Sequence, residues 1–374
     1  MISITASDLV AKIKMGWNLG NTFDAHGEKN GFAELRKGYI DSTPTEMEAA
    51  WVDHVTTREN IDAIKAAGFN AIRIPVTWLK ACDADYNIRA DWIARVKEVV
   101  GYAAANNMII SVDSHHDERY YSLLDKDMPV VKKVYVKLWE QIAEAFKDYD
   151  ENLILEGLNE PRTIGTKTEW YGTTEDQKNL NMLNQLFVDT VRSSGGNNSH
   201  RILMVPTVAA SASEVAQRAF VLPNDTVKNR LIVSLHSYEP FEFALETGHD
   251  RPVVWDENNP DDTEPITAPI DLAYELFVSK AVPVIMGEMG ALNRNNIDSR
   301  VAWTEFYVSY ARSKKIPCFW WDPWMTYVTR PDDEHDHWVE TFGIFNRETN
   351  EFDHPGIVLA MQCATSGTSC ASGT

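Results

Sequence analysis

Two glutamates in this 374-residue chain each stand at the end of a short apolar run. Glu160 closes the stretch that begins at Leu153, and Pro161 follows it; Glu288 closes the stretch that begins at Val282. Such runs are typical of buried strands, and proline does not continue a central strand. We therefore expect two carboxylates at the carboxyl ends of two strands. Hydrolysis of a glycosidic bond needs two carboxyl groups, one to protonate the leaving oxygen and one to attack or to activate water.

The charge of the chain limits its partners. The formal net charge is −20, which argues against nucleic acid and anionic membranes because both would repel the protein. No run of about 18 apolar residues is present, so we expect no transmembrane helix. The first residues lack the basic region and apolar core of a signal peptide. A neutral polysaccharide suits this charge, no cofactor is indicated, and a monomer is the expected state.

The end of the chain differs in composition from the rest. Residues 363–374 are rich in Ser, Thr and Gly, which predicts the remnant of a flexible linker to a further domain. Residues 1–362 are expected to form one catalytic domain. Cys363 and Cys370 could pair, whereas Cys82 and Cys318 have the character of ordinary buried thiols.

Strand-like and helix-like segments alternate along the chain. The expected strands are Ile13–Leu19, Phe69–Ile74, Met108–Val112, Leu153–Leu158, Ile202–Val205, Leu231–Leu235, Val282–Met286 and Ile316–Trp321. The expected helices include Asp91–Asn106, Val130–Lys147, Asn179–Ser193, Ile270–Lys280 and Ser299–Lys314, and another that begins with a capping box from Thr56 to Glu59. Eight such units predict an α/β fold, a closed (β/α)₈ TIM barrel in a single domain. An open doubly wound sheet is the alternative, which the missing Gly-rich phosphate loop disfavours.

A barrel of this kind collects its chemistry at the carboxyl ends of the strands. Polar and aromatic residues stand at those ends in this sequence. They include Asn21, Arg73, His115, His116, Asn159, Glu160, His236, Tyr238, Glu288 and Trp321. Long loops follow some of the strands, and such loops usually build a substrate cleft. These are Asp117–Met128, Arg162–Asp176, Glu239–Thr267 and Trp324–Trp338.

Seven motifs at these positions resemble those of glycoside hydrolase family 5, the cellulase family, and its fourth subfamily of endo-β-1,4-glucanases in particular. They are Gly16–Thr22, Gly68–Trp78, His115–Asp117, Leu158–Arg162, His236–Tyr238, Gly287–Ala291 and Trp320–Asp322, which occur in the family's order and cover roughly residues 8 to 361. The resemblance implies a secreted enzyme that cleaves internal bonds with retention of configuration. It implies Glu160 as the acid/base and Glu288 as the nucleophile.

The same resemblance implies supporting roles around the cleaved sugar for Arg73, His115, Asn159, His236, Tyr238 and Trp321. Charge-assisted bonds from Arg73 should keep Glu288 ionised, and Tyr238 should donate a hydrogen bond to it. Asn21 and His116 are expected to bind the next sugar, although a turn-capping asparagine and a structural histidine are alternatives of similar weight. Glu156 is expected to be a structural, partnered carboxylate, and Trp320 a core residue.

Two other classes of protein remain open at this point. A metal-dependent barrel hydrolase could use His115, His116, Asp117 and His236, since histidines and carboxylates at strand ends are metal ligands. That reading leaves Glu160 and Glu288 without a role. A non-catalytic sugar-binding barrel would be expected to lack one of the two glutamates. Within the enzyme class, xyloglucan, lichenan, mannan and xylan are alternative substrates, and no metal site is expected.

Overall fold

Eight parallel strands close into a barrel in this computed structural model, which describes residues 3–26, 39, 41–120, 122–246, 254–324 and 341–368. The strands are β1 (Gly16–Leu19), β2 (Ala71–Ile74), β3 (Ile109–Asp113), β4 (Leu153–Glu156), β5 (Leu203–Ser211), β6 (Leu231–His236), β7 (Val284–Met289) and β8 (Cys318–Asp322). Each strand pairs with the next along the chain, and β8 pairs with β1. The predicted (β/α)₈ barrel is confirmed, and an open sheet is excluded.

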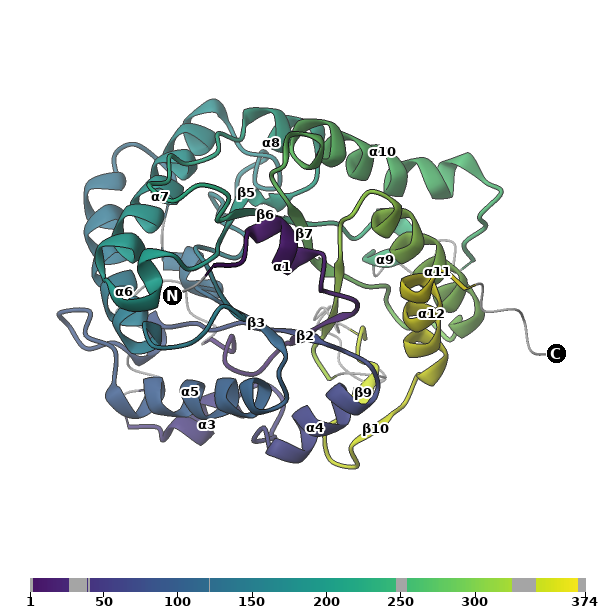
Figure 1. The fold of residues 1–374 in the computed structure, drawn as a ribbon, viewed down its shortest axis with the longest axis horizontal. Helices are drawn as coiled ribbons and strands as arrows, with labels where there is room; N and C mark the ends of the chain where they lie inside the picture. Colours follow the sequence, from purple (N-terminus) through teal and green to yellow (C-terminus); the bar gives the residue numbers. More distant parts are fainter. Residues whose placement is uncertain are drawn as a thin grey trace.

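Helices surround the barrel as an outer layer (Figure 1). They are α3 (Pro44–Glu48), α4 (Arg58–Ala66), α5 (Ala90–Ala105), α6 (Met128–Phe146), α7 (Thr174–Ser193), α8 (Glu214–Ala219), α9 (Phe241–Ala244), α10 (Pro260–Leu276), α11 (Ile297–Ser313) and α12 (Pro355–Ser366), with the short 3₁₀ turns η1 (Leu79–Ala81), η2 (His116–Tyr120), η3 (Gly196–Ser199) and η4 (Val278–Lys280). A two-stranded ribbon of β9 (Phe345–Asn346) and β10 (Glu351–Phe352) precedes α12. None of the described helices combines the length and hydropathy that spanning a membrane requires.

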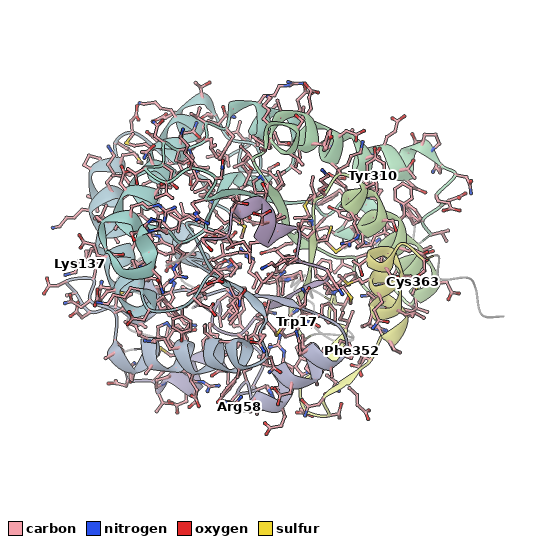
Figure 2. All side chains as sticks on the ribbon, in the orientation of Figure 1. Trp17, Arg58, Lys137, Tyr310, Phe352 and Cys363 are labelled. Atoms are coloured by element: carbon pink, nitrogen blue, oxygen red, sulfur yellow. The ribbon has the colours of Figure 1, made fainter. Side chains whose placement is uncertain are left out.

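The amino-terminal end of the barrel is closed by the first helix, α1 (Ala6–Val10), which faces the viewer in Figure 1. Its buried residues Leu9 and Val10 belong to one apolar cluster with the early residues of several strands, among them Ala71 and Ile154. Figure 2 shows Trp17 inside the molecule, whereas Arg58 and Lys137 lie on the outer helices. Because this end is filled by apolar side chains, the polar strand ends can gather only at the opposite face.

The helix α4 begins one residue later than the sequence predicts. Its N-cap is Thr57, whose side chain accepts a hydrogen bond from the backbone N–H of Asn60, while the Asn60 side-chain oxygen accepts one from the backbone N–H of Thr57. The predicted capping box of Thr56 and Glu59 is therefore wrong. Asn60 is fixed from a second side, because its amide nitrogen donates to the carbonyl of Arg347 at 2.7 Å. A tertiary contact thus selects between two adjacent threonines that could both cap a helix.

The predicted loop Glu239–Thr267 is partly helical. It contains α9, and α10 begins at Pro260, ten residues before the predicted start. Pro260 occupies the first turn, where proline is tolerated, and the Asn259 side chain accepts a hydrogen bond from the Asp261 N–H. Pro265 and Pro269 lie inside α10. These prolines suggested a loop, and α10 accommodates them through burial of Ile266 and Ile270 against the barrel.

The carboxyl-terminal helix extends beyond the predicted domain boundary at residue 362. α12 continues through Ser366 and ends at Gly367, which has a φ of +73°. The first residues of the predicted linker are therefore helical. Cys363 in this helix is disulfide-bonded, whereas Cys82 and Cys318 are buried free thiols. Cys370, residues 369–374 and the loop residues 325–338 lie outside the described residues.

Candidate active site

Glu160 and Glu288 lie close together at the carboxyl end of the barrel. Glu160 follows β4, with three residues between the end of the strand and the glutamate, and Glu288 lies in β7. One carboxylate oxygen of Glu160 and one of Glu288 are within 4.8 Å of each other. Burial raises the pKa of both carboxyl groups. Two carboxyl groups about 5 Å apart are the arrangement of retaining glycosidases, whereas inverting enzymes separate them by roughly 6.5–9.5 Å.

Arg73 in β2 joins Glu288 to the barrel interior. Its guanidinium lies 2.7 Å from Glu288, 2.7 Å from Asp113 and 2.6 Å from Glu156. The Arg73 side chain is fully buried, so this one cation is shared by three carboxylates in a region without bulk water. The sequence left open whether Arg73 binds Glu288 or forms an ion pair in the barrel core, and the structure shows both contacts.

Glu156 is a partnered structural carboxylate, as predicted. Its side chain is fully buried and accepts hydrogen bonds from Arg73 and, at 2.8 Å, from Ser234. Asn18 completes this layer, because its carbonyl oxygen accepts from Arg73 Nη1 and its nitrogen donates to the backbone of Gly287. Sequence reasoning assigned no role to Asn18 or Ser234. Their position at the inward face of β1 and β6 is the signal that could have identified them.

Tyr238 and His236 contact the glutamates from the end of β6. The Tyr238 hydroxyl donates to Glu288 Oε2 at 2.8 Å. His236 Nδ1 lies 3.0 Å from Glu160 Oε1 and 3.6 Å from Glu288 Oε2. Burial lowers the pKa of His236 to about 4, so the imidazole is neutral at neutral pH. A neutral His236 placed between both carboxylates can orient them without adding a charge.

His115 and Trp321 form a second wall of the site. His115 Nδ1 lies 2.8 Å from Asp113, and the rings of His115 and Trp321 are stacked 5.6 Å apart, with an interplanar angle of 2°. Burial lowers the pKa of His115 well below its usual range. Trp321 points toward the cleft, whereas the neighbouring Trp320 is fully buried in the main core, as predicted.

Asn159, Asn21 and His116 also border the cleft. The Asn159 carbonyl oxygen accepts from Arg73 at 2.8 Å, which leaves its amide nitrogen as the group able to donate to a ligand. Asn21 has a left-handed backbone with φ +56°, and its backbone N–H donates to the Asp24 carboxylate, so it lies in a turn that Asp24 caps. His116 Nδ1 lies 3.4 Å from Glu118.

Glu118 and Arg162 are buried residues beside Glu160 that received no role from the sequence. Arg162 Nη1 lies 3.2 Å from Glu160 and 3.7 Å from Glu118, and Arg162 Nε lies 3.0 Å from Glu169. The guanidinium also lies over the ring of Trp170, 4.3 Å from its centroid. Arg162 therefore connects the Glu160 carboxylate to the loop that precedes α7. The position of Arg162 two residues after Glu160 is the sequence feature that could have identified it as a neighbour of that carboxylate.

The glutamates lie at the bottom of a cleft of about 1,420 Å³. Trp51, 40% exposed, lines it on the side of β1, and Trp170 lines it beyond β4. Trp324 contacts His54, with ring centroids 5.1 Å apart, and is not among the residues that line the cleft. A cleft of this size exceeds the 300–1,000 Å³ or so that a drug-sized ligand occupies.

Two groups of described residues place possible metal ligands within 4.8 Å of one another, namely Asp24 with His115 and His116, and Glu160 with His236 and Glu288. The oxygens of Asp24 accept the backbone N–H groups of Asn21 and Thr22. In the second group Arg73 already supplies a cation 2.7 Å from Glu288. The contacts of both groups are therefore explained by protein partners. Asp117, the other predicted ligand, is buried and belongs to neither group; it accepts from Ser114.

Comparison with known proteins agrees with this geometry. Residues 32–326 match the family model for cellulase, glycosyl hydrolase family 5. The chain is 39% identical to endoglucanase B of Ruminococcus albus over 96% of its own length and 80% of that protein. It is 38% identical to endoglucanase A of Clostridium longisporum over 92% of its length, but spans 63% of that relative, and it spans 40% of the cellulase/esterase CelE of Acetivibrio thermocellus.

Solved structures agree in fold over nearly the whole chain. A GH5-4 broad specificity endoglucanase from Ruminococcus champanellensis with bound cellotriose has a TM-score of 0.87 at 39% identity, covering 96% of this chain and 99% of that one. A GH5 xyloglucan-specific endo-β-1,4-glucanase from a metagenomic library, in complex with cellotriose, has a TM-score of 0.83 at 34% identity, covering 95% and 97%. The chain thus belongs to glycosyl hydrolase family 5, the cellulase family.

Proposed function

We propose that this chain is an endo-β-1,4-glucanase that hydrolyses internal bonds of β-glucan chains with retention of anomeric configuration. The observation that carries the proposal is the approach of Glu160 and Glu288 to within 4.8 Å at the bottom of a long cleft. Family membership and the endoglucanase names of relatives over most of the chain support the same activity.

In this mechanism Glu288 attacks the anomeric carbon and forms a covalent glycosyl-enzyme, while Glu160 gives its proton to the leaving oxygen. Glu160 then removes a proton from the incoming water, which releases the sugar. Burial raises the pKa of Glu160, which favours the protonated form that the first step requires. Burial also raises the pKa of Glu288, and the charge of Arg73 and the Tyr238 hydrogen bond act against that rise.

Residues around the pair would bind the sugar at the cleaved bond. The Asn159 amide nitrogen is the donor available to the 2-hydroxyl, a contact that strengthens in the transition state. Trp321 is held flat by its stack with His115 and would offer its ring to a sugar face. Asn21, His116 and Trp51 lie along the cleft on the β1 side and would contact the following sugars.

The experiment that tests this function is proton NMR of a soluble cello-oligosaccharide during hydrolysis, with Glu160→Gln and Glu288→Gln as comparisons. We expect the β-anomer as the first product and loss of activity on the oligosaccharide in both variants. If the α-anomer is formed first, or if either variant keeps near-normal activity, the assigned roles are wrong. If the wild-type chain hydrolyses no β-glucan, mannan or xylan, the proposed function is wrong.

Chelation separates the two-glutamate mechanism from a metal-dependent one. After dialysis against EDTA, we expect kcat/KM on β-glucan to stay within about twofold of the untreated value, because both reacting groups are carboxyls of the chain itself. The control is the same protein dialysed against buffer alone. The EDTA-treated sample is then assayed again after addition of Zn²⁺ or Mn²⁺. Loss of activity with EDTA and its return on metal addition would favour the metal-dependent class.

Tyr238→Phe should change the pH dependence of activity. The Tyr238 hydrogen bond lowers the pKa of Glu288, so its loss raises that pKa. Because Glu288 must be ionised to attack, the acidic limb of kcat/KM should move to higher pH, with a fall of about ten- to a hundredfold near the optimum. The control is Tyr307→Phe, which removes a buried hydroxyl bonded to the Ser237 carbonyl and should leave the limb in place.

The substrate range and compartment follow as parts of the same proposal. Solved relatives include a lichenase and a xyloglucan-specific enzyme, so mixed-linkage glucan and xyloglucan are the additional substrates to assay. We also propose that the chain works outside the cell, because a disulfide at Cys363 is stable in an oxidising environment. A monomer as the state of the chain completes the proposal.

A further inference from the structure

Arg162 contacts both the side chain and the backbone of Glu160. Its Nη1 donates to the Glu160 carbonyl at 2.8 Å and to Glu160 Oε2 at 3.2 Å. The Arg162 side chain is only 8% exposed, so salt and bulk water screen its charge weakly. A cation at this distance stabilises the ionised form of Glu160, whereas the first step of the reaction requires the protonated form. The charge of Arg162 must therefore be offset if Glu160 is to act as an acid.

Glu169 is a second carboxylate on the same guanidinium. Its Oε1 accepts from Arg162 Nε at 3.0 Å, and its Oε2 accepts from the backbone N–H of Gly165 at 2.7 Å. Both oxygens are thus bound within the segment between β4 and α7, which fixes the position of Glu169. The ring of the next residue, Trp170, covers the guanidinium, with the ring centroid 4.3 Å away. Arg162 is therefore held in one place beside Glu160.

Glu118 is the third carboxyl near Arg162, but it offsets little of the charge. Its Oε1 lies 3.7 Å from Arg162 Nη1, beyond hydrogen-bonding distance, and its Oε2 has no hydrogen-bond partner among the residues that the structure describes. Glu118 is 1% exposed, and burial raises its pKa well above the usual range. A buried carboxyl with an unpaired oxygen favours the neutral form. This leaves Glu169 as the carboxylate that pairs with Arg162 on the side away from Glu160.

The titratable and charged groups that face Glu160 in the described part of the chain come from several elements. They are Arg73 from β2, Glu118 from η2, His236 from β6, Glu288 from β7, and Arg162 and Glu169 from the segment between β4 and α7. Burial lowers the pKa of His236 to about 4, so this ring is neutral at neutral pH. The charge of Arg73 is shared by three carboxylates, Glu288 among them. Arg162 is therefore the cation whose effect on Glu160 depends on a single further partner.

From these contacts we infer that Glu169 is a positioning residue for the proposed acid: it holds Arg162 and offsets its charge, so that Glu160 keeps its proton until the leaving oxygen takes it. The inference rests on the proposed function, in which Glu160 is the acid/base. Burial raises the pKa of Glu160, the charge of Arg162 lowers it and the charge of Glu169 raises it, in agreement with this role. Once the proton has left, Arg162 remains 3.2 Å from Glu160 and stabilises the carboxylate that acts as base in the second step.

Glu169→Gln tests the inference, because it removes the charge and keeps the shape of the side chain. With the charge of Arg162 no longer offset, Glu160 should lose its proton at lower pH. We expect the basic limb of kcat/KM on cellotetraose to move down by about 0.5–1 pH unit, which is a fall of about three- to tenfold at a pH above the limb. On an aryl cellobioside whose leaving group departs without a proton, the pH profiles of Glu169→Gln and wild type should coincide.

A double variant should give the opposite sign. Adding Arg162→Met to Glu169→Gln removes both members of the ion pair, so neither is left buried without its partner. Because no cation then favours the ionised form of Glu160 from this side, the basic limb should lie above its wild-type position. The control is Asp225→Asn, which removes the carboxylate of a buried pair with Arg192 at 2.7 Å, away from the cleft, and should leave the limb in place.

The titration of Glu160 can also be measured without turnover. Carboxyl-carbon NMR of glutamate-labelled protein follows it, and Glu160→Gln identifies the resonance. We expect a lower pKa of Glu160 in Glu169→Gln and a higher one in the double variant.

The inference would be overturned by a lowered limb that is the same in the single and double variants, or by a loss of activity in Glu169→Gln that leaves the limb in place, which is the effect of a merely structural residue. A Glu160 carboxyl that titrates alike in wild type and Glu169→Gln would overturn the inference alone. A wild-type chain that cleaves no β-glucan would overturn the proposed function and this inference together.

Discussion

Glu288→Ala is expected to lower kcat on soluble β-glucan by about 10⁵-fold or more, because it removes the group that forms the covalent intermediate. The vacated space lies beside Arg73 and Tyr238, which contact Glu288 at 2.7 and 2.8 Å. A small anion such as azide can enter that space and be stabilised by the same donors. Azide should therefore restore cleavage of an aryl cellobioside, whose leaving group departs without a proton, and the sugar is released as a glycosyl azide.

The configuration of the azide product identifies which glutamate has been replaced. In Glu288→Ala, azide takes the place of the nucleophile and attacks once, which gives the α-glycosyl azide. In Glu160→Ala, Glu288 still forms the glycosyl-enzyme and azide attacks it from the opposite face, which gives the β-glycosyl azide. Product NMR distinguishes the two. A β-azide from Glu288→Ala, or recovery in neither variant, would contradict the assignment of nucleophile and acid/base.

The barrel and the positions of Glu160 and Glu288 were predictable because their signals are local. An apolar run that ends in a polar residue predicts a strand. It also predicts that the side chain of this polar residue lies at the carboxyl-terminal face of the barrel. That reasoning placed Glu160, Glu288, Tyr238 and His236 at one end of the molecule before any distance was known. The family motifs then added which residues would meet there.

The remaining features depend on contacts between distant segments. The role of Asn18 becomes clear only from its contact with Arg73, which in turn binds Glu288. Glu118 lies in a 3₁₀ turn without apolar periodicity, and its burial against Arg162 follows from the path of two loops. The start of α10 was mispredicted because its prolines are local signals for a loop, whereas burial of one helix face decides the outcome.

Removal of Arg73 should have the largest effect on stability among the site residues. Arg73→Met leaves Asp113, Glu156 and Glu288 buried without their shared cation. Breaking a buried ion pair by deleting one partner typically costs about 3–5 kcal/mol, and we expect a loss of that size in the free energy of unfolding at pH 7. The measurement is urea unfolding followed by far-UV circular dichroism.

The loss should depend on pH in a defined direction. Burial already raises the pKa of Asp113 to about 6 and raises that of Glu288, although Arg73 acts against both shifts. Without Arg73 these folded-state pKa values rise further above the unfolded ones. A carboxyl whose pKa is raised on folding costs stability at pH values above its unfolded pKa, so the destabilisation should be largest at pH 7 and smaller at pH 5.

Arg95→Met is the matched control for this change. Arg95 forms a buried pair with Glu48 at 2.6 Å, on the outer side of the barrel and away from the cleft. Its loss should also destabilise the fold, but kcat/KM of the folded protein should stay near the wild-type value. Arg73→Met should lose activity even under conditions where it is folded, because Glu288 then lacks the charge that keeps it ionised. If the free energy of unfolding of Arg73→Met at pH 7 lies within about 1 kcal/mol of the wild-type value, the prediction is wrong. The three carboxyls would then bind protons at little cost in place of the arginine.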